Sequence, residues 1–430
     1  MHEVDDALAA SSRRLGGLLV DITPLRESRD FRLLYAGQLI TATGTQLTAV
    51  AAPVQVYQLT ESSLAVGLLG LSQLVPLIIG SLFGGALADA HDRRKLLLLS
   101  QSLLALTSLG LVLNAFTGSP LLWPIYVLTG ASAALSGLDH PTRSAAVPTL
   151  VRREILPRAL ALVQLSWQVC LVVGPALAGL IIAKFSLTAA YGFDVVTFAI
   201  AIVFVARLRP LVPEGGGTKA SRSSMLEGIR YLRGKQALQG TFVIDINAMV
   251  FGMPRALFPA LGLTLFNGDA TTVGLLYAAP GAGSVVGAAT SGWLARIDRQ
   301  GLGVIIAVMA WGASVLVFGI VPWLWLALLL LAVAGAADVV SAVFRNSILQ
   351  LTVPDRLRGR LSATHIAVVT GGPRLGDAEA GAVAALTTPQ FSVVSGGLAC
   401  VIGALLVGVT MPRLARWTIS RDAVVIDDER

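Results

Sequence analysis

Long apolar runs alternate with short polar segments along most of the chain. A bilayer core of about 30 Å needs roughly 20 apolar residues in a helix, and the sequence offers twelve runs of suitable length. They cover 32–58, 64–88, 95–116, 121–145, 158–184, 188–206, 239–266, 271–295, 301–320, 323–348, 360–386 and 392–412. The pattern predicts an all-α membrane protein with twelve transmembrane helices.

The longest polar segment between two runs lies at 207–238 and divides the runs six and six. Such a layout indicates two parallel repeats around a central site. We therefore expect a six-helix bundle at 32–206 and a second one at 239–412, joined by this linker. Tails would occupy 1–31 and 413–430. No apolar core with a cleavage site precedes the first run, so we expect no signal peptide.

Composition and charge support the membrane assignment. Hydrophobic residues make up 55% of the chain and charged residues 13%, against about 25% charged in soluble domains. Of the 32 Lys and Arg residues, all but Lys184, Arg255 and Arg374 lie in the two tails and in every second connection. By the positive-inside rule this side is cytoplasmic. The net charge of +7 then needs no nucleic-acid partner. We expect a multi-pass protein of the cell membrane with both termini in the cytoplasm.

A short motif occurs twice, at equivalent places in the two halves. Residues 85–95, after the second run, read Gly-Ala-Leu-Ala-Asp-Ala-His-Asp-Arg-Arg-Lys. Residues 292–299, after the eighth run, repeat this pattern in degenerate form as Gly-Trp-Leu-Ala-Arg-Ile-Asp-Arg. The repeat indicates that the halves are related structural units.

The first copy resembles the loop signature of the major facilitator superfamily, G-x-L-A-D-R-x-G-R-R/K, with Ala90 and Asp92 departing from it. The run 158–184 is similar to the antiporter signature G-x-x-x-G-P-x-x-G-G of that superfamily. Its matching residues are Gly174, Pro175 and Gly179, whereas Cys170 and Ala178 replace glycines. Finer landmarks resemble the branch that contains the bacterial enterobactin exporter and related drug–proton antiporters.

The resemblance implies alternating access powered by proton influx, and export of a small organic molecule. A catecholate siderophore is the leading cargo and multidrug efflux the alternative. Gating would involve Gly85, Asp89, Arg93 and Arg94, with Asp89 meeting the start of the eleventh helix near Arg358 and Arg360. Gly174, Pro175 and Gly179 would form a bent seam that prevents proton leakage. The structural alternatives are a solvated topology anchor for the loop and an ordinary packing kink for the seam.

Charges inside apolar runs are costly and usually mark a pathway or a pair. Arg255 and Asp377 lie at similar depths in the runs 239–266 and 360–386, so they could meet. Arg374 lies on the same helical face as Asp377, and Glu379 points elsewhere. Our hypothesis is that Asp377, alone or together with Glu379, carries the coupling proton, while Arg255 and Arg374 set the pKa of Asp377 or receive anionic cargo. The alternative is a permanent ion pair that fixes helix packing.

Two further pairs lie near the cytoplasmic ends of symmetry-related runs. Asp139 and Arg143 are spaced i,i+4, and Asp338 and Arg345 are spaced i,i+7. We interpret them as salt bridges at the cytoplasmic gate, either within one helix or between the halves.

Polar side chains form a stripe along the first run. Gln38, Thr41 and Thr45 are spaced by three or four residues, and Gln46 adds another amide. The stripe suits a cavity wall, although hydrogen bonds between helices would give the same pattern.

No motif indicates catalysis or a bound cofactor. His91, His140 and His365 lie in separate segments without metal-ligand spacing, and we find neither a nucleotide-binding loop nor a nucleophile elbow. We therefore expect a non-enzymatic monomer whose partners are a small-molecule cargo, protons and membrane lipid. A membrane sensor or scaffold, a membrane-embedded enzyme and an importer are the competing classes.

Overall fold

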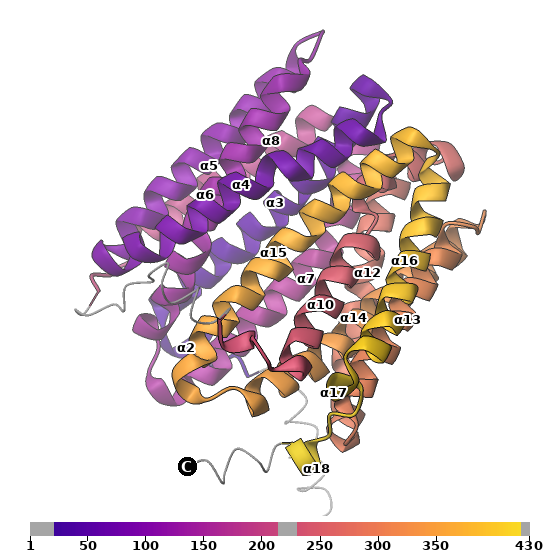
Figure 1. Cartoon of the computed structure of the whole chain (residues 1–430). Helices are drawn as coiled ribbons and strands as arrows, with labels where there is room; N and C mark the ends of the chain where they lie inside the picture. The colour runs from indigo at the N-terminus through magenta and orange to yellow at the C-terminus, as the bar shows by residue number, and fades with distance from the viewer. Residues whose placement is uncertain (1–20, 214–229, 423–430) are drawn as a thin grey trace, which may run out of the picture.

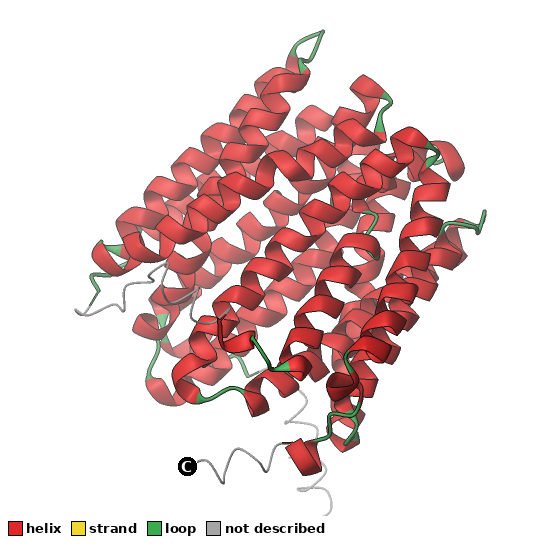
Figure 2. Cartoon of the chain, in the orientation of Figure 1, coloured by secondary structure: helices red, strands yellow, loops and turns green. Residues whose placement is uncertain are grey.

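The computed structural model describes residues 21–213 and 230–422. The segments 1–20, 214–229 and 423–430 lie outside this description, as do the side chains of residues 355–360, 362–364, 366, 367 and 421. The expected tails and linker are therefore seen only in part. Throughout the described residues the regular structure is helical, and the connections are short (Figure 2).

Twelve long helical segments follow the twelve apolar runs within the described ranges (Figure 1). The first half contains α3 (Arg29–Thr60), α4 (Ser63–Ala90), α5 (Arg93–Phe116), α6 (Leu122–Leu150), α7 (Leu156–Lys184) and α8 (Leu187–Ala206), with the short α2 (Thr23–Glu27) and η1 (Arg153–Ile155). The second half contains α10 (Gln236–Phe251), η2 (Arg255–Leu257), α11 (Phe258–Ala260), η3 (Leu261–Leu265), α12 (Ala270–Ala289), η4 (Ser291–Arg296), α13 (Gln300–Phe318), α14 (Leu324–Thr352), α15 (Asp355–Leu386), α16 (Pro389–Thr410), α17 (Pro412–Ala415) and α18 (Ile419–Asp422).

Several helices begin at a capping side chain. The hydroxyl of Ser28 accepts the Phe31 amide at the start of α3, and Asp92 accepts the Arg94 amide at the start of α5. Some helices also extend beyond the predicted runs. For example, α6 continues to Leu150 and α15 begins at Asp355. Hydropathy detects only the bilayer-spanning part of a helix, whereas backbone hydrogen bonding continues into the polar region.

The predicted run 239–266 is not one continuous helix. It breaks after Phe251 and resumes as η2, α11 and the π-helical η3. Gly252 and Pro254 stand in the break, and Pro254 lacks an amide hydrogen to continue the helical ladder. The predicted span is present, but it contains a backbone break between apolar residues that an average of hydropathy does not register.

Helix contacts divide the structure into two six-helix bundles. Within the first bundle, α3 packs on α7 and α8, α4 on α6, and α5 on α6 and α8. Within the second, α10 packs on α15, α12 on α14, and α13 on α14 and α16. Two helix pairs make most of the contacts between the bundles: α4 lies beside α15 (Figure 1), and α7 lies beside α12.

The outward faces carry large apolar side chains. Val75 of α4, Leu106 of α5 and Leu406 of α16 are all more than half exposed. Nine of the spanning segments in the described ranges are long and apolar enough to cross a membrane. The other three, α3, α6 and α15, are more polar. A lipid environment accounts for the outward-facing apolar side chains.

The seam between the bundles depends on residues with little or no side chain. A Cβ on Gly179 of α7 would lie 2.5 Å from the Ala270 carbonyl oxygen and 2.9 Å from the Gly274 Cα of α12. On the other side, a Cβ on Gly381 of α15 would lie 2.6 Å from the Ser63 carbonyl oxygen of α4. The bundles therefore meet where α4 and α12 begin and α7 and α15 end.

We predict that Gly179→Ala lowers the free energy of unfolding of the observed conformation by about 1–3 kcal/mol, because the added methyl overpacks the seam. Detergent melting temperatures measure the effect. Gly192→Ala in α8 is the matched control, because a Cβ there meets nothing within 4 Å. Equal melting temperatures for the two variants would contradict the close packing.

Candidate functional site

A cavity of about 310 Å³ lies between the two bundles. The first bundle lines it with residues of α3, α4, α6 and α7, and the second with residues of η2, α12 and α15. The polar lining residues are Thr45, Gln46, Thr48, Gln73, Thr129, Ser132, Ser136, Arg255, Tyr277, Arg374 and Asp377. The cavity is thus built from both halves of the chain.

The polar groups are divided unequally between the bundles. Hydroxyl and amide side chains come from α3, α4 and α6, with the Tyr277 hydroxyl added from α12, whereas the three charged residues come from η2 and α15. With two arginines and one aspartate, the charged wall has a formal excess of one positive charge if all three are ionised. One wall therefore offers neutral hydrogen-bonding groups and the other offers charge.

Three side chains satisfy backbone groups at the break after α10. The Trp311 indole nitrogen donates to the Gly252 carbonyl at 2.7 Å, and the Tyr277 hydroxyl donates to the Arg255 carbonyl at 3.0 Å. The Ala256 amide donates to Asp377 Oδ1 at 3.0 Å. A broken helix at membrane depth is tolerated where it lines a cavity and its free backbone groups find partners. Asp377 is one of those partners.

Arg255, Arg374 and Asp377 share the cavity, but no ion pair joins them among the described residues. Asp377 binds the backbone beside Arg255, not its guanidinium. Arg374 Nη1 donates to the Thr370 carbonyl of its own helix at 2.7 Å, while its Nε is buried without a partner. The permanent pair that the sequence left open is thus not formed in this conformation, and both guanidinium groups are uncompensated by a bound carboxylate.

Arg345 lies closer to Asp245, a partner that the sequence did not reveal, than to the expected partner Asp338. Arg345 Nη2 lies 3.8 Å from Asp338, but its Nη1 contacts Asp245 of α10 more closely. Asp245 and the Arg345 side chain are almost fully buried. His365 Nε2 lies 3.4 Å from Asp245 Oδ2. The pair joins helices within the second bundle and does not cross to the first.

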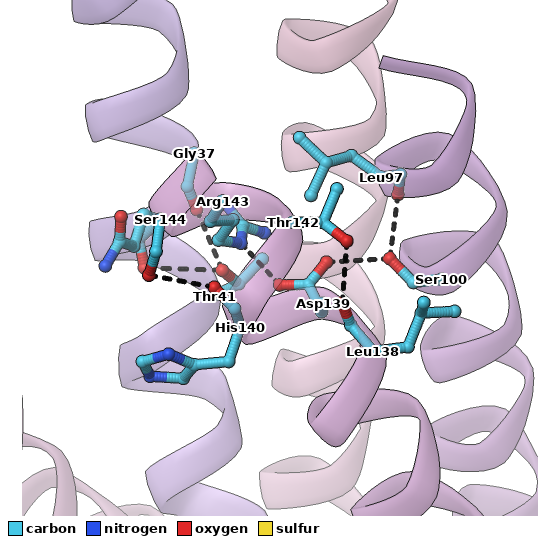
Figure 3. A network of polar contacts seen from close by, with 11 residues as sticks. Gly37, Thr41, Leu97, Ser100, Leu138, Asp139, His140, Thr142, Arg143 and Ser144 are labelled. Carbon is cyan, nitrogen blue, oxygen red and sulfur yellow. Dashed lines mark hydrogen bonds and ion pairs between the residues drawn. The ribbon is translucent and has the colours of Figure 1, made fainter. Parts of the chain in front are cut away.

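Asp139 and Arg143 form an ion pair within α6 (Figure 3). The other carboxylate oxygen of Asp139 accepts the Ser100 hydroxyl of α5 at 2.7 Å. Of the two expected arrangements, the structure therefore has the bridge within one helix. Arg143 and Arg345 lie the same number of residues before the ends of α6 and α14, two helices of 29 residues each. This correspondence extends the internal repeat to buried charge pairs.

The arginines of the loop motif after α4 bind backbone carbonyls of the first bundle. Arg93 donates to the Ala88 and Ala145 carbonyls at 3.2 and 3.1 Å, and Arg94 donates to the Ala206 carbonyl at 2.5 Å. Asp89 is exposed, and a Cβ on Gly85 would meet nothing within 4 Å. The side chains of Arg358 and Arg360 lie outside the described part, so their expected contact with Asp89 stays a prediction.

The polar stripe of α3 reaches the cavity only in part. Thr45 and Gln46 line it, whereas Gln38 and Thr41 do not. Thr41 is buried, and its hydroxyl donates to the Gly37 carbonyl at 3.0 Å. Glu379 is half-buried and is not part of the lining. The part of the expected stripe nearer the start of α3 therefore lies outside the cavity lining.

The residues that match the antiporter signature pack against two different helices, α3 and α12. Gly174 faces α3, because a Cβ there would lie 2.5 Å from Gln46 Cβ. Pro175 and Gly179 face α12, where a Cβ on Gly274 would lie 2.5 Å from the Pro175 carbonyl oxygen. Pro175 and Gly179 therefore lie on the seam between the bundles, and Gly174 lies inside the first bundle.

Sequence reasoning missed three residues that the structure brings into or near the site. Asp245 and Asp194 are buried carboxylates inside apolar runs, and the rule that singled out Asp377 would have found them. Tyr277 lines the cavity and supports the helix break, but a single tyrosine in an apolar run gives no signal from sequence.

Solved transporters share this architecture. The nucleoside transporter NupG superimposes with a TM-score of 0.72 at 12% identity, covering 88% of this chain and 98% of that one. A bacterial homologue of the human lysosomal transporter Spinster, in an inward-facing and unoccupied conformation, gives 0.69 at 14% identity, covering 90% and 98%. At such identities the likeness concerns the fold alone. Together with the two repeats and the cavity between them, it shows that the fold is of the major facilitator type.

A family model described as a transmembrane secretion effector matches residues 20–423, and the chain belongs to this family. Its relatives include the enterobactin exporter EntS of Citrobacter koseri, 30% identical over 399 residues that cover 93% of this chain and 96% of that protein. The enterobactin exporter EntS of Escherichia coli O157:H7 is 28% identical over 410 residues, covering 95% and 98%. The chain is a multi-pass membrane transporter.

We predict that Asp245→Asn destabilises the protein by about 3–5 kcal/mol, because it leaves the Arg345 guanidinium buried without its close partner. Asp338→Asn is the matched control. The side chain of Asp338 is 28% exposed and lies 3.8 Å from Arg345, so its loss should cost much less. Unfolding in denaturant would measure both variants. Equal destabilisation would mean that Asp245 is not the main partner.

Proposed function

We propose that this transporter exports a small anionic molecule of the catecholate siderophore class, driven by proton influx. The observation that carries the proposal is the cavity wall with two guanidinium groups, Arg255 and Arg374, which no carboxylate pairs with in the described residues. Catechol oxygens and carboxylates are acceptors for such charged donors. The relatives named enterobactin exporters support the same cargo class.

Asp377 is the proposed site of proton coupling. As a carboxylate it accepts a charge-assisted hydrogen bond from Ala256 and lies near both arginines. Protonation would weaken the bond to the backbone and remove the negative charge that repels anionic cargo from the two arginines. Deprotonation would restore the bond and favour cargo release. Glu379 is the secondary candidate on the same helix.

Alternating access would occur by rocking of the bundles 32–206 and 239–412 about the seam, with 207–238 as the linker. We place both termini in the cytoplasm, on the basis of the basic connections. The seam then closes the outer ends, and the conformation is inward-facing. In the outward-facing state, Asp89 would bind the start of α15 near Arg358 and Arg360. Arg93 and Arg94 would anchor the loop, and the pairs of Arg143 and Arg345 would stiffen the gate helices.

The cavity is formed within one chain, which supports a monomer as the transporting unit. Its surroundings would be the lipid of the cell membrane. Apart from proton transfer, no step of this cycle makes or breaks a covalent bond, and none requires a cofactor or nucleic acid.

Deleting the gene in its host tests the cargo. We expect less catecholate siderophore in the medium and unchanged resistance to lipophilic drugs. Unchanged secretion with new drug sensitivity would replace the proposal by multidrug efflux. If neither property changes, and vesicles containing the purified protein move no cargo under a pH gradient, a scaffold or sensor role is favoured.

We predict that Arg255→Gln and Arg374→Gln each raise the KM for a catecholate in vesicles by about tenfold or more, since a hydrogen bond to a charged group contributes about 1.5–3 kcal/mol. Arg207→Gln is the matched control, because Arg207 is exposed beyond the end of α8. KM values that equal the wild type in both cavity variants would exclude the arginines from cargo binding.

We predict that Asp377→Asn abolishes transport driven by a pH gradient while the melting temperature stays near that of the wild type. The amide oxygen of Asn can still accept the Ala256 hydrogen bond, but the side chain no longer titrates. Asp377→Leu should in addition lose about 1–3 kcal/mol of stability, because the amide is left without an acceptor. Gradient-driven transport by Asp377→Asn at the wild-type rate would rule out this carboxyl as the proton carrier.

A further inference from the structure

Asp194 of α8 is a buried carboxyl that the proposed cycle leaves unused. Its residue is 2% exposed, and it sits in an apolar helix of the first bundle. Three carboxylates are buried among the described residues: Asp139, Asp194 and Asp245. Asp139 and Asp245 each pair with an arginine. Asp194 forms no ion pair in the described part of the chain, so, unlike Asp139 and Asp245, it has no positively charged partner there.

Neutral hydroxyl groups surround this carboxyl. Thr48 of α3 and Ser108 of α5 donate to Asp194 Oδ2 at 2.7 and 2.8 Å. Thr197 lies 3.5 Å from Oδ1, and its hydroxyl donates to the Asp194 carbonyl at 2.7 Å. Oδ2 therefore accepts two hydrogen bonds, whereas the one polar neighbour of Oδ1 in the described residues is the Thr197 hydroxyl, 3.5 Å away. A proton on Oδ1 would find the Thr197 oxygen as an acceptor.

The packed helices bring no positive charge into the carboxyl's hydrogen-bonding shell. Helices α3, α5 and α7 contact α8, and their charged residues stand at helix ends: 29–32 on α3, 93–95 on α5, and Arg158 and Lys184 on α7. The other titratable groups are Tyr35, Tyr57, Cys170 and Tyr191, of which Tyr191 donates to Gln55 Oε1 at 2.8 Å. A buried charge without a counter-charge is strongly disfavoured, so a neutral carboxyl fits this setting.

One of the three hydroxyl donors also faces the transport cavity. Thr48 lines the cavity, and its hydroxyl contacts Asp194 Oδ2. Gly44, one turn earlier on α3, leaves room for this contact, because a Cβ there would lie 2.5 Å from Asp194 Oδ1. A single side chain therefore separates the buried carboxyl from the cavity, and a movement of α3 against α8 would open a path between them.

We infer that Asp194 is a second proton-binding site of the transport cycle, filled and emptied through Thr48 from the cavity. Protonation forms one O–H bond on the carboxyl and removes its charge. Deprotonation requires a rearranged shell that admits water from the cavity. This inference rests on the proposed proton coupling, and it adds a carboxyl in the first bundle to the one at Asp377 in the second.

Infrared titration of the purified full-length protein tests the inference without any cargo. We expect the wild type to show the carbonyl stretch of a protonated carboxyl at neutral pH, and Asp194→Asn to lose that band while Asp377→Asn keeps it. If Asp194→Asn removes no such band at any pH, the carboxyl is ionised and the inference is overturned. The band does not depend on export, so a wrong cargo would leave this result unchanged.

A second pair of variants on α5 guards against misfolding of Asp194→Asn. Ser108→Ala removes one hydroxyl donor that favours the charged form, so the band should persist to higher pH. Thr107→Val is the matched control, because the neighbouring Thr107 hydroxyl donates only to the Leu104 carbonyl. Identical titrations of the two variants would show that the hydroxyl shell does not govern a protonated Asp194 and would contradict the inference.

In vesicles, with enterobactin as the probe, Asp194→Asn should lose the pH dependence of transport but retain exchange across the membrane without a gradient. Loss of both activities in a variant that keeps its wild-type melting temperature would contradict a coupling role. If the wild type itself moves no enterobactin, the proposed cargo fails, whereas the infrared result still decides the proton site.

Discussion

The hydrogen bond from the Ala256 amide to Asp377 is the contact on which the candidate site depends. The helix break at Gly252–Pro254 leaves backbone groups without helical partners inside the membrane region, where each such group is costly. Asp377 satisfies one of them from a different helix and Trp311 satisfies another, while Tyr277 binds the Arg255 carbonyl beside the break. A titratable carboxyl thus supports the backbone of the cavity wall, and a change in its charge acts directly on the shape of that wall.

The two bundles contribute different polar groups to the cavity, and few polar contacts join one bundle to the other. The second bundle supplies the charged groups of the cavity, and the first supplies hydroxyls and amides. Each bundle also carries a buried arginine pair of its own, Arg143 with Asp139 and Arg345 with Asp245. The seam between them is built from Gly179, Gly274 and other small residues. Rigid units joined by a smooth surface can move as bodies, because their internal ion pairs stay intact.

Much of the architecture was predictable from sequence, because the apolar runs mark the segments that lie in lipid and the basic connections mark loops between them. Two kinds of feature were not. The break near Pro254 depends on backbone geometry that hydropathy does not register, and the partner of Arg345 depends on packing between helices far apart in sequence. Asp194 and Asp245 are of another kind, because each carries the same sequence signal as Asp377, a charge within an apolar run.

The polarity of α3, α6 and α15 has a consequence for biogenesis. These helices, outside the set that is apolar enough to span alone, carry eight of the eleven polar residues that line the cavity. Insertion of a segment into lipid is governed by its summed transfer free energy, to which central charges and amides contribute unfavourably. Such segments enter the bilayer stably only against a neighbour, as α15 does against α4 and α16. The polar residues that line the path for cargo therefore make membrane insertion of these helices depend on contacts with neighbouring helices.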